Sequence, residues 1–306
     1  MSTKLQLTTT ALNATKDLKE LVEMPAVRQN AILNLIKTRG VSDQQANMIY
    51  ERERILFSQV KNLDKCDKFS IYAAWIQLFA AGRTLIDGDS YIVAYGKQAQ
   101  FQIGWKGRLA QMGDIPEIAN IPPPQVVYDN DEFDFELGEN PRIIKHKPVK
   151  DNKGELAYVY LVIHKKSGKE THIMDRNAVL GIRDRYSKSY QQYMADCKAG
   201  GHAIGSTFKK NMGNWDITVE PPMWISSEEQ AWKKTLVKRA YASQQNKTPR
   251  MKAIDQEIEK NVEEEDIQNI DYAVVNDAPK EIQQETQAQP DTKQQQPDLG
   301  NLNEAF

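Results

Sequence analysis

The stretch Tyr91-Ile-Val-Ala-Tyr-Gly-Lys-Gln-Ala-Gln-Phe-Gln-Ile-Gly-Trp-Lys-Gly-Arg-Leu-Ala-Gln-Met-Gly113 has the pattern of two strands, a tight turn and a short helix. Apolar or aromatic residues recur at every second position of both strand segments, which is typical of half-buried strands. Gly96-Lys97 lies between the segments and fits a two-residue hairpin turn, because glycine readily adopts the positive φ that such turns need. The residues expected to face the interior are Tyr91, Val93 and Tyr95 in the first strand and Ala99, Phe101 and Ile103 in the second.

The helix predicted over Trp105–Gly113 begins directly after the second strand, where Gly104 turns the chain. Lys106 and Arg108 would then be held between a strand end and a helix start, and Lys97 would lie in the hairpin turn. Cations held in this way suit a phosphate backbone better than cations on free loops. Lys97, Trp105, Lys106 and Arg108 are therefore candidate contacts for a nucleic acid.

Helix signals flank this unit. Pro25 is well placed as the first residue of a helix that ends at Gly40, and Ser42-Asp-Gln-Gln45 is a capping box that opens a longer helix. A third helix, from Phe69 to Ala81, carries an aromatic stripe that we interpret as core. Further helices are expected over residues 175–183, 189–199 and 224–241, the last one capped by Ser227.

Four segments between these helices have strand character and are separated by turn signals. We expect them to form a meander of Phe133–Leu137, Arg142–Lys147, Leu156–His164 and Thr171–Met174. Together with the helices, they predict an α+β fold in which a small antiparallel sheet and hairpins are backed by helices.

Charge is divided unevenly along the 306 residues, whose net charge is −2. Residues 251–306 contain 4 Lys/Arg and 14 Asp/Glu, whereas residues 1–250 contain 36 and 28. A basic body with an acidic tail indicates a polyanionic partner for the body. We expect a flexible arm over residues 1–24, a core over 25–249, and an acidic, glutamine-rich tail over 250–306 that is largely disordered from about residue 275.

Composition also argues against several classes of protein. Cys66 and Cys197 lie far apart and outside any C-x-x-C pattern, so neither a disulfide framework nor a cysteine metal site is indicated. The first residues lack the apolar core of a signal peptide, and no run approaches the roughly 20 apolar residues of a membrane span. We therefore expect a cytoplasmic protein without membrane contacts.

Motifs for covalent chemistry are absent: no Walker loop, G-x-S-x-G or H-E-x-x-H occurs. His164 and His172 flank a predicted hairpin and could face each other as a metal pair, although exposed strand histidines are the simpler interpretation. Asp129, Asp131 and Asp134 are close enough in sequence to suggest a metal-dependent nuclease site, but acids in a turn-rich stretch are more typical of a soluble loop. We predict a protein without covalent catalysis.

The basic residues are better organised. From Arg142 to Arg250 the chain has 21 Lys/Arg and 10 Asp/Glu. Arg183-Asp-Arg-Tyr-Ser-Lys188 places three cations at a helix junction beside Tyr186, an aromatic residue that could stack on a base. Phosphate contacts of such cations are independent of sequence and sensitive to salt. The full set of candidate DNA contacts is Lys97, Trp105, Lys106, Arg108, Arg183, Arg185, Tyr186, Lys188, Lys198, Lys209 and Lys210.

A second basic group, Lys233, Lys234, Lys238 and Arg239, admits two interpretations. Lys233 and Lys234 follow Glu228 and Glu229 and include i,i+4 partners, and cations late in a helix suit its dipole, so helix stabilisation explains much of this pattern. Contact with a nucleic acid is the alternative.

Three blocks resemble, in order and spacing, the RecT family of phage single-strand annealing proteins. They are Tyr91–Gly113, Tyr158–Arg185, and the segment from Trp224 through Ala231-Trp-Lys-Lys-Thr-Leu-Val-Lys-Arg239. The resemblance covers roughly residues 30–245. It implies an α+β core like that of RecT and Redβ proteins, with DNA contacts at Lys106 and Arg108 in the first block and at Arg183, Arg185 and Lys188 in the later one.

The family resemblance further implies an ATP-independent recombinase that coats single-stranded DNA, anneals it through a duplex intermediate and promotes strand invasion. It implies a homo-oligomer, either ring or filament, in which we expect residues 42–60 to supply subunit contacts. A phage exonuclease and the host single-strand-binding protein are the implied partners. No cofactor is expected to be required, although Mg²⁺ is expected to modulate DNA binding.

Two questions stay open at the level of sequence. The helices at 175–183 and 189–199 could instead be the helix-turn-helix of a non-oligomeric regulator. The acidic tail could be an inert linker, could compete with DNA for the basic surface, or could dock on a partner through Leu302–Phe306.

Overall fold

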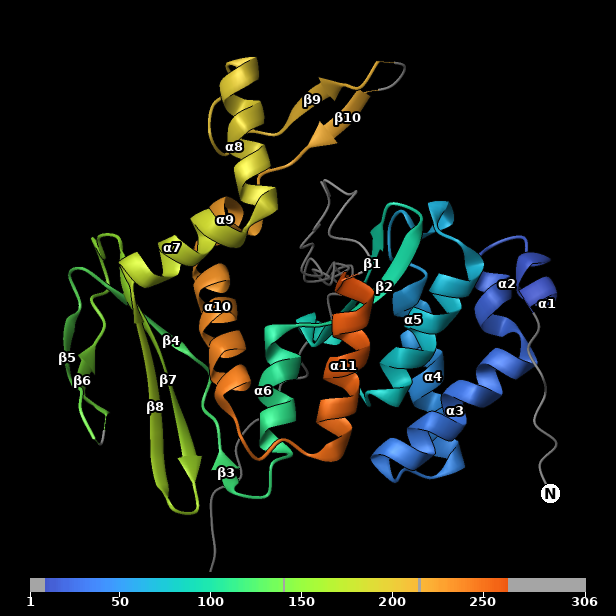
Figure 1. Cartoon of the computed structure of the whole chain (residues 1–306), viewed down its shortest axis with the longest axis horizontal. Coiled ribbons are helices and arrows are strands. Elements are labelled where there is room, and N and C mark those ends of the chain that lie inside the picture. Colours follow the sequence, from blue (N-terminus) through green and yellow to red (C-terminus); the bar gives the residue numbers. More distant parts are fainter. Residues whose placement is uncertain (1–8, 140, 214–215, 264–306) are drawn as a thin grey trace, which may run out of the picture. The chain divides into compact units, whose positions relative to one another are not determined.

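The computed structural model describes residues 9–139, 141–213 and 216–263. Helices and small antiparallel sheets share this part of the chain, so the predicted α+β class is confirmed (Figure 1). The disorder predicted from about residue 275 onward lies outside the described residues.

Five helices at the start of the described chain share one hydrophobic core. Their bounds follow the sequence signals: Gly40 ends one helix in the left-handed region with φ 62°, and Ser42 and Gln45 form the predicted capping box. The aromatic stripe is core, as predicted, with the buried Trp75 ring 4.7 Å from that of Phe79. These helices are α1 (Thr9–Asn13), α2 (Leu18–Glu23), α3 (Pro25–Arg39), α4 (Asp43–Phe57) and α5 (Lys68–Ala80).

The predicted arm contributes to this core. From Thr9 on it is helical, and Leu12, Leu21 and Val22 are buried among the residues of α3, α4 and α5. The Tyr50 hydroxyl donates a hydrogen bond to the carbonyl of Val22 and joins α2 to α4.

Strands β1 (Ser90–Tyr95) and β2 (Gln98–Ile103) form the predicted hairpin and pack on α5. The inward face predicted for β2 is confirmed, but that of β1 is wrong by one residue, because Ile92 is buried and Tyr91 is exposed. A two-residue turn pairs Tyr95 with Gln98 and Ile92 with Phe101, and paired residues share a face. A two-residue turn at Gly96-Lys97 therefore places Ile92 on the same inward face as Phe101. The alternation of apolar residues within β1 alone does not show which of its two faces is buried.

A second sheet is built on the long strand β7 (Leu156–Lys165). Strand β8 (Gly168–Asp175) pairs along its whole length, while β4 (Gln125–Tyr128) pairs near its start and β3 (Ile118–Asn120) near its end. The predicted four-strand meander is therefore wrong, because β4 pairs with β7 where β6 was expected. Strands β5 (Glu132–Glu136) and β6 (Arg142–Lys147) form a separate hairpin, whose Phe133 ring stacks on Tyr160 of β7.

Helices α6 (Trp105–Gly113) and α10 (Glu228–Ser243) share a second core with this sheet. Trp232, Leu236 and Val237 of α10 are fully or almost fully buried there. The predicted helix over 224–241 is interrupted: α9 (Met223–Ser226) ends at Ser227, which occupies the N-cap position of α10 without a side-chain capping bond. Because α10 contacts both α6 and α7 (Arg176–Tyr186), it connects two of the regions that carry predicted DNA contacts.

The remaining elements follow α7. Helix α8 (Lys188–Gly200) and the hairpin of β9 (Phe208–Asn211) and β10 (Asp216–Val219) enclose a small core around Tyr193. Helix α11 (Pro249–Glu263) begins where the tail was predicted to begin, and its Met251 is buried in the second core. The Arg250 guanidinium donates to the carbonyls of Thr38 and Ala80, each at 3.1 Å, so the first turn of α11 is bonded to the ends of α3 and α5.

Candidate nucleic-acid interface

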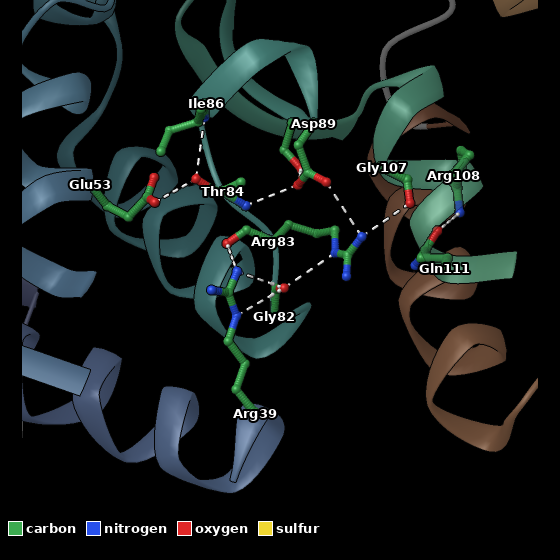
Figure 2. A network of polar contacts seen from close by, with 11 residues as sticks. Arg39, Glu53, Gly82, Arg83, Thr84, Ile86, Asp89, Gly107, Arg108 and Gln111 are labelled. Carbon is green, nitrogen blue, oxygen red and sulfur yellow. Dashed lines mark hydrogen bonds and ion pairs between the residues drawn. The ribbon is translucent and has the colours of Figure 1, made fainter. Parts of the chain in front are cut away.

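The start of α6 lies directly against the loop that precedes β1. The Gly104 amide donates to the Asp89 carbonyl at 2.8 Å. The Arg83 guanidinium donates to the Gly107 carbonyl at 3.1 Å (Figure 2). A Cβ on Gly104 would lie 2.0 Å from the Gly88 carbonyl oxygen, and one on Gly107 would lie 2.2 Å from that of Asp89. Both glycines of the Gly-Trp-Lys-Gly segment are therefore required by close backbone contact.

The loop itself is held by buried polar groups. Glu53 of α4 is completely buried and accepts hydrogen bonds from the Thr84 hydroxyl at 2.5 Å and the Leu85 amide at 2.8 Å. The Thr84 amide donates to Asp89 at 2.9 Å, and Arg39 of α3 donates to the Gly82 carbonyl at 2.9 Å (Figure 2). Helices α3 and α4 thus determine the position of the loop that supports α6.

Of the α6 candidates, Lys106 is exposed and Arg108 is not. The Lys106 ammonium lies 6.0 Å from the ring centroid of Trp105, which is half-buried against the second core. The Arg108 side chain is only 15% exposed; its guanidinium donates to Asp255 of α11 at 2.6 Å and lies 4.4 Å from the Tyr241 ring centroid. Arg108 therefore connects α6, α10 and α11 in this conformation.

The helix junction presents most of its predicted contacts to solvent. Arg185, Tyr186 and Lys188 are exposed, and the Arg185 guanidinium lies 5.8 Å from the Tyr186 ring centroid. Tyr186 is 68% exposed, which is unusual for a large aromatic side chain and makes one ring available for stacking. Arg183 is more enclosed: it donates to Asp184 at 2.7 Å and lies 4.3 Å from the Tyr190 ring centroid.

The other candidates lie apart from these two groups. Lys198 is exposed on α8, and Lys209 is exposed on β9. Lys210 follows Lys209 on β9, and its ammonium is 2.7 Å from Asp196 of α8. Lys97 is exposed in the β1–β2 turn, where its carbonyl accepts a hydrogen bond from the Asp67 amide.

Two of the three acids of the nuclease alternative, Asp129 and Asp131, have structural partners. Asp129 accepts from Arg176 at 2.8 Å, and Asp131 accepts from the amides of Tyr128 and Val149, each at 2.8 Å. These amide bonds, together with His146, hold the pKa of Asp131 below its usual value although burial acts in the opposite direction. Among the described residues, no three His, Cys, Asp or Glu side chains are grouped as a metal site.

The other two alternatives also fit the geometry poorly. His164 pairs with Lys169 and His172 with Leu161, so the two histidines do not face each other across the β7–β8 hairpin. Helices α7 and α8 are joined by Ser187 alone, whereas a helix-turn-helix has a turn of about 3–4 residues between its helices.

In the ranges that the structure describes, no helix has both the length and the apolar character needed to cross a bilayer.

Comparison with curated proteins finds no match. A model of the RecT family matches residues 45–277, which include α6, the α7–α8 junction and α10. This match covers most of the chain and contains all three blocks whose spacing resembles that family. The chain therefore belongs to the RecT family, whose members are phage recombination proteins that bind and anneal single-stranded DNA.

Proposed function

We propose that this protein anneals complementary strands without ATP, by holding single-stranded DNA through its phosphate backbone on a basic surface. The observation that carries the proposal is the α7–α8 junction, where the exposed Tyr186 ring lies beside the exposed cations Arg185 and Lys188. A ring that stacks on any base, flanked by cations that contact the backbone, binds single strands without reading their sequence.

No covalent chemistry is needed for this function. Base pairing supplies the driving force, and the protein has to hold two strands extended with their base edges free. Lys106 on α6 and the junction cations would hold the backbone, while Lys198 and Lys209 would extend the surface along α8 and β9. Mg²⁺ would act by competing for the same phosphates.

Annealing of long strands favours an array of subunits, each holding a few nucleotides. We propose that the outward face of α4 contributes the contact with a second copy, since Met48 is 60% and Ile55 is 57% exposed there. Arg54 on the same helix is ion-paired with Glu51 and Glu23. Arg52 is about half exposed, and its guanidinium is ion-paired with the buried Glu53 at 2.8 Å.

The remaining proposals follow from membership of the family. They are a ring or filament of subunits, an annealed duplex intermediate, strand invasion, a phage exonuclease and the host single-strand-binding protein as partners, and action in the cytoplasm.

One experiment tests the proposed function. Two complementary oligonucleotides are mixed with the full-length protein without ATP, while duplex formation is followed by fluorescence and complex size by light scattering. We expect pairing faster than the spontaneous rate, and complexes larger than a monomer on DNA. Spontaneous-rate pairing with a monomeric protein would refute the proposal.

The double variant Met48→Glu, Ile55→Glu tests the subunit contact separately. It should reduce complex size and annealing while the affinity for a short oligonucleotide is retained. Leu137→Glu is a matched control on the β5–β6 hairpin, since Leu137 is also exposed. Equal complex sizes for the double variant and the control would remove α4 from the contact.

A further inference from the structure

Helix α10 carries two lysines that helix stabilisation does not explain. Lys234 and Lys238 lie four residues apart, and therefore on one face of the helix. The residue four positions before Lys234 is Gln230, and that before Lys238 is Lys234, so neither lysine has the acidic i,i+4 partner that stabilises a helix. Both lie before the last turn of α10, which contains no basic residue. The pairing explanation holds for Lys233, whose ammonium is 3.5 Å from Glu229.

The surroundings of this pair are also positive. Lys238 experiences the charge of Arg108 on α6, and Lys234 experiences that of Lys238. Over the described residues, neither lysine forms an ion pair, whereas the nearby Arg108 and Lys247 both pair with Asp255. Arg108 on α6 and Lys234 and Lys238 on α10 thus form a group of three cations. Asp255, the acid described beside this group, is already paired with both Arg108 and Lys247.

Keeping such a group charged has a cost. Burial, and next the charge of Lys238, lowers the pKa of the half-buried Lys234 to about 8. A methionine at position 234 would fill the same space without this cost. An anion that binds between the cations would raise the pKa of Lys234 towards its usual value and offset the repulsion between Lys234 and Lys238.

We propose that Lys234 and Lys238 form a phosphate-binding subsite for the backbone of single-stranded DNA, placed on α10 between the α6 and α7 regions. The inference rests on the proposed function and deepens it, because α10 contacts both α6 and α7 and so connects Lys106 with the helix junction. A phosphodiester is the chemistry that fits: two ammonium groups one helical turn apart bind it as point charges, without reading a base.

Arg108 is a positioning residue in this arrangement. Its guanidinium is bonded to Gln111 at 2.9 Å and to Asp255 at 2.6 Å, so it holds α6 against α10 and α11. Its positive charge still favours an anion at Lys238. The sequence places Arg108 beside Lys106 at a helix start, and it does not reveal that Asp255, 147 residues away, pairs with Arg108.

The test uses the full-length protein and a fluorescent oligo-dT as the probe, with anisotropy measured at several salt concentrations. Lys234→Gln and Lys238→Gln should each weaken binding about tenfold, which corresponds to roughly 1.4 kcal/mol. Each should reduce the slope of log K against log salt by about 0.7, the value for one phosphate contact on a single strand. Lys234→Arg should retain the affinity, because it retains the charge.

Lys233→Gln and Arg239→Gln are matched controls, since they remove the same charge from adjacent positions of α10. Each should change the affinity less than about threefold, which corresponds to about 0.65 kcal/mol. If Lys234→Gln and Lys238→Gln match these controls while the wild type binds oligo-dT, the subsite is refuted and the proposed function stands. If the wild type itself does not bind oligo-dT, the proposed function fails and the subsite fails with it.

Discussion

The Arg108 guanidinium of α6 lies 2.6 Å from the Asp255 carboxylate of α11, across 147 residues of sequence. The same carboxylate accepts from the Tyr241 hydroxyl at 3.0 Å and pairs with Lys247 at 3.3 Å. The Tyr241 ring has Arg108 at 4.4 Å and Lys247 at 4.2 Å from its centroid. One acidic side chain therefore joins three segments of a basic region.

Replacing this acid should have two opposite effects. Asp255→Asn removes the charge that Arg108 and Lys247 share, so we expect the free energy of unfolding to fall by about 2–3 kcal/mol. It also leaves both cations without a counter-charge, so the affinity for oligo-dT should rise. Chemical denaturation and anisotropy measure the two effects. Glu132→Gln, which removes the acid of an exposed pair with Lys145, should change neither quantity, and a result for Asp255→Asn equal to this control would contradict the prediction.

The glycine at position 107 should be irreplaceable for a steric reason. Its absent Cβ would lie 2.2 Å from the backbone oxygen of Asp89, and Gly107→Ala should therefore destabilise the fold by about 3 kcal/mol. Gly181→Ala in α7 is the matched control, because nothing lies within 4 Å of its Cβ position. Alanine favours a helix over glycine, so this control should stabilise by about 0.5–1 kcal/mol. Similar midpoints of urea unfolding for the two variants would show that the backbone contact is unimportant.

Lys234→Met should stabilise the protein although it removes a charge from its surface. The folded-state pKa of about 8 lies below the unfolded value of roughly 10.4. Below pH 8 both states are protonated, and the cost of the half-buried charge, on the order of 1–3 kcal/mol, is fully present. Between the two pKa values the unfolded state binds the additional proton, so the stability of the wild type rises with pH.

The advantage of Lys234→Met should accordingly be largest at pH 7 and shrink towards pH 10. Thermal unfolding of both proteins across this range measures the difference. Lys233→Met is the matched control, because it makes the same change at the adjacent position, where the lysine is paired with Glu229. A variant that melts below the wild type at pH 7 would mean that the Lys234 ammonium is favourably solvated or paired.

Local signals were sufficient for the hairpin, the helix caps and the glycine-bounded α6, because each depends on residues close together in sequence. The capping box of Ser42 and Gln45 and the cap of Asp175, whose carboxylate accepts from the Ala178 amide, are examples. The face of β1 was misjudged, although turn register determines it. Strand β4 is missing from the predicted elements, because its pairing with β7 is not visible in a four-residue segment.

The candidate site was harder to predict for a different reason. A cation can contact DNA only if it is exposed and not already paired with an acid. The acids that pair with two of the candidates lie elsewhere in the sequence: Asp255 pairs with Arg108, and Asp196 pairs with Lys210. The converse holds for Lys234. Glu229 lies four residues before Lys233 and pairs with it, so Lys234, which lies four residues after Gln230, has no acidic i,i+4 partner on α10.

Tyr186 offers the clearest separation of binding from stability. Its ring is 68% exposed, so Tyr186→Ala should leave the unfolding midpoint unchanged. If the ring stacks on a base, the same change should weaken oligo-dT binding by about 1–3 kcal/mol, with little effect on the salt slope because no phosphate contact is lost. Tyr186→Phe keeps the aromatic face and should bind like the wild type. Tyr190→Phe, which keeps the ring beneath Arg183, is a second control. Unchanged affinity for Tyr186→Ala would show that the junction binds DNA through its cations alone.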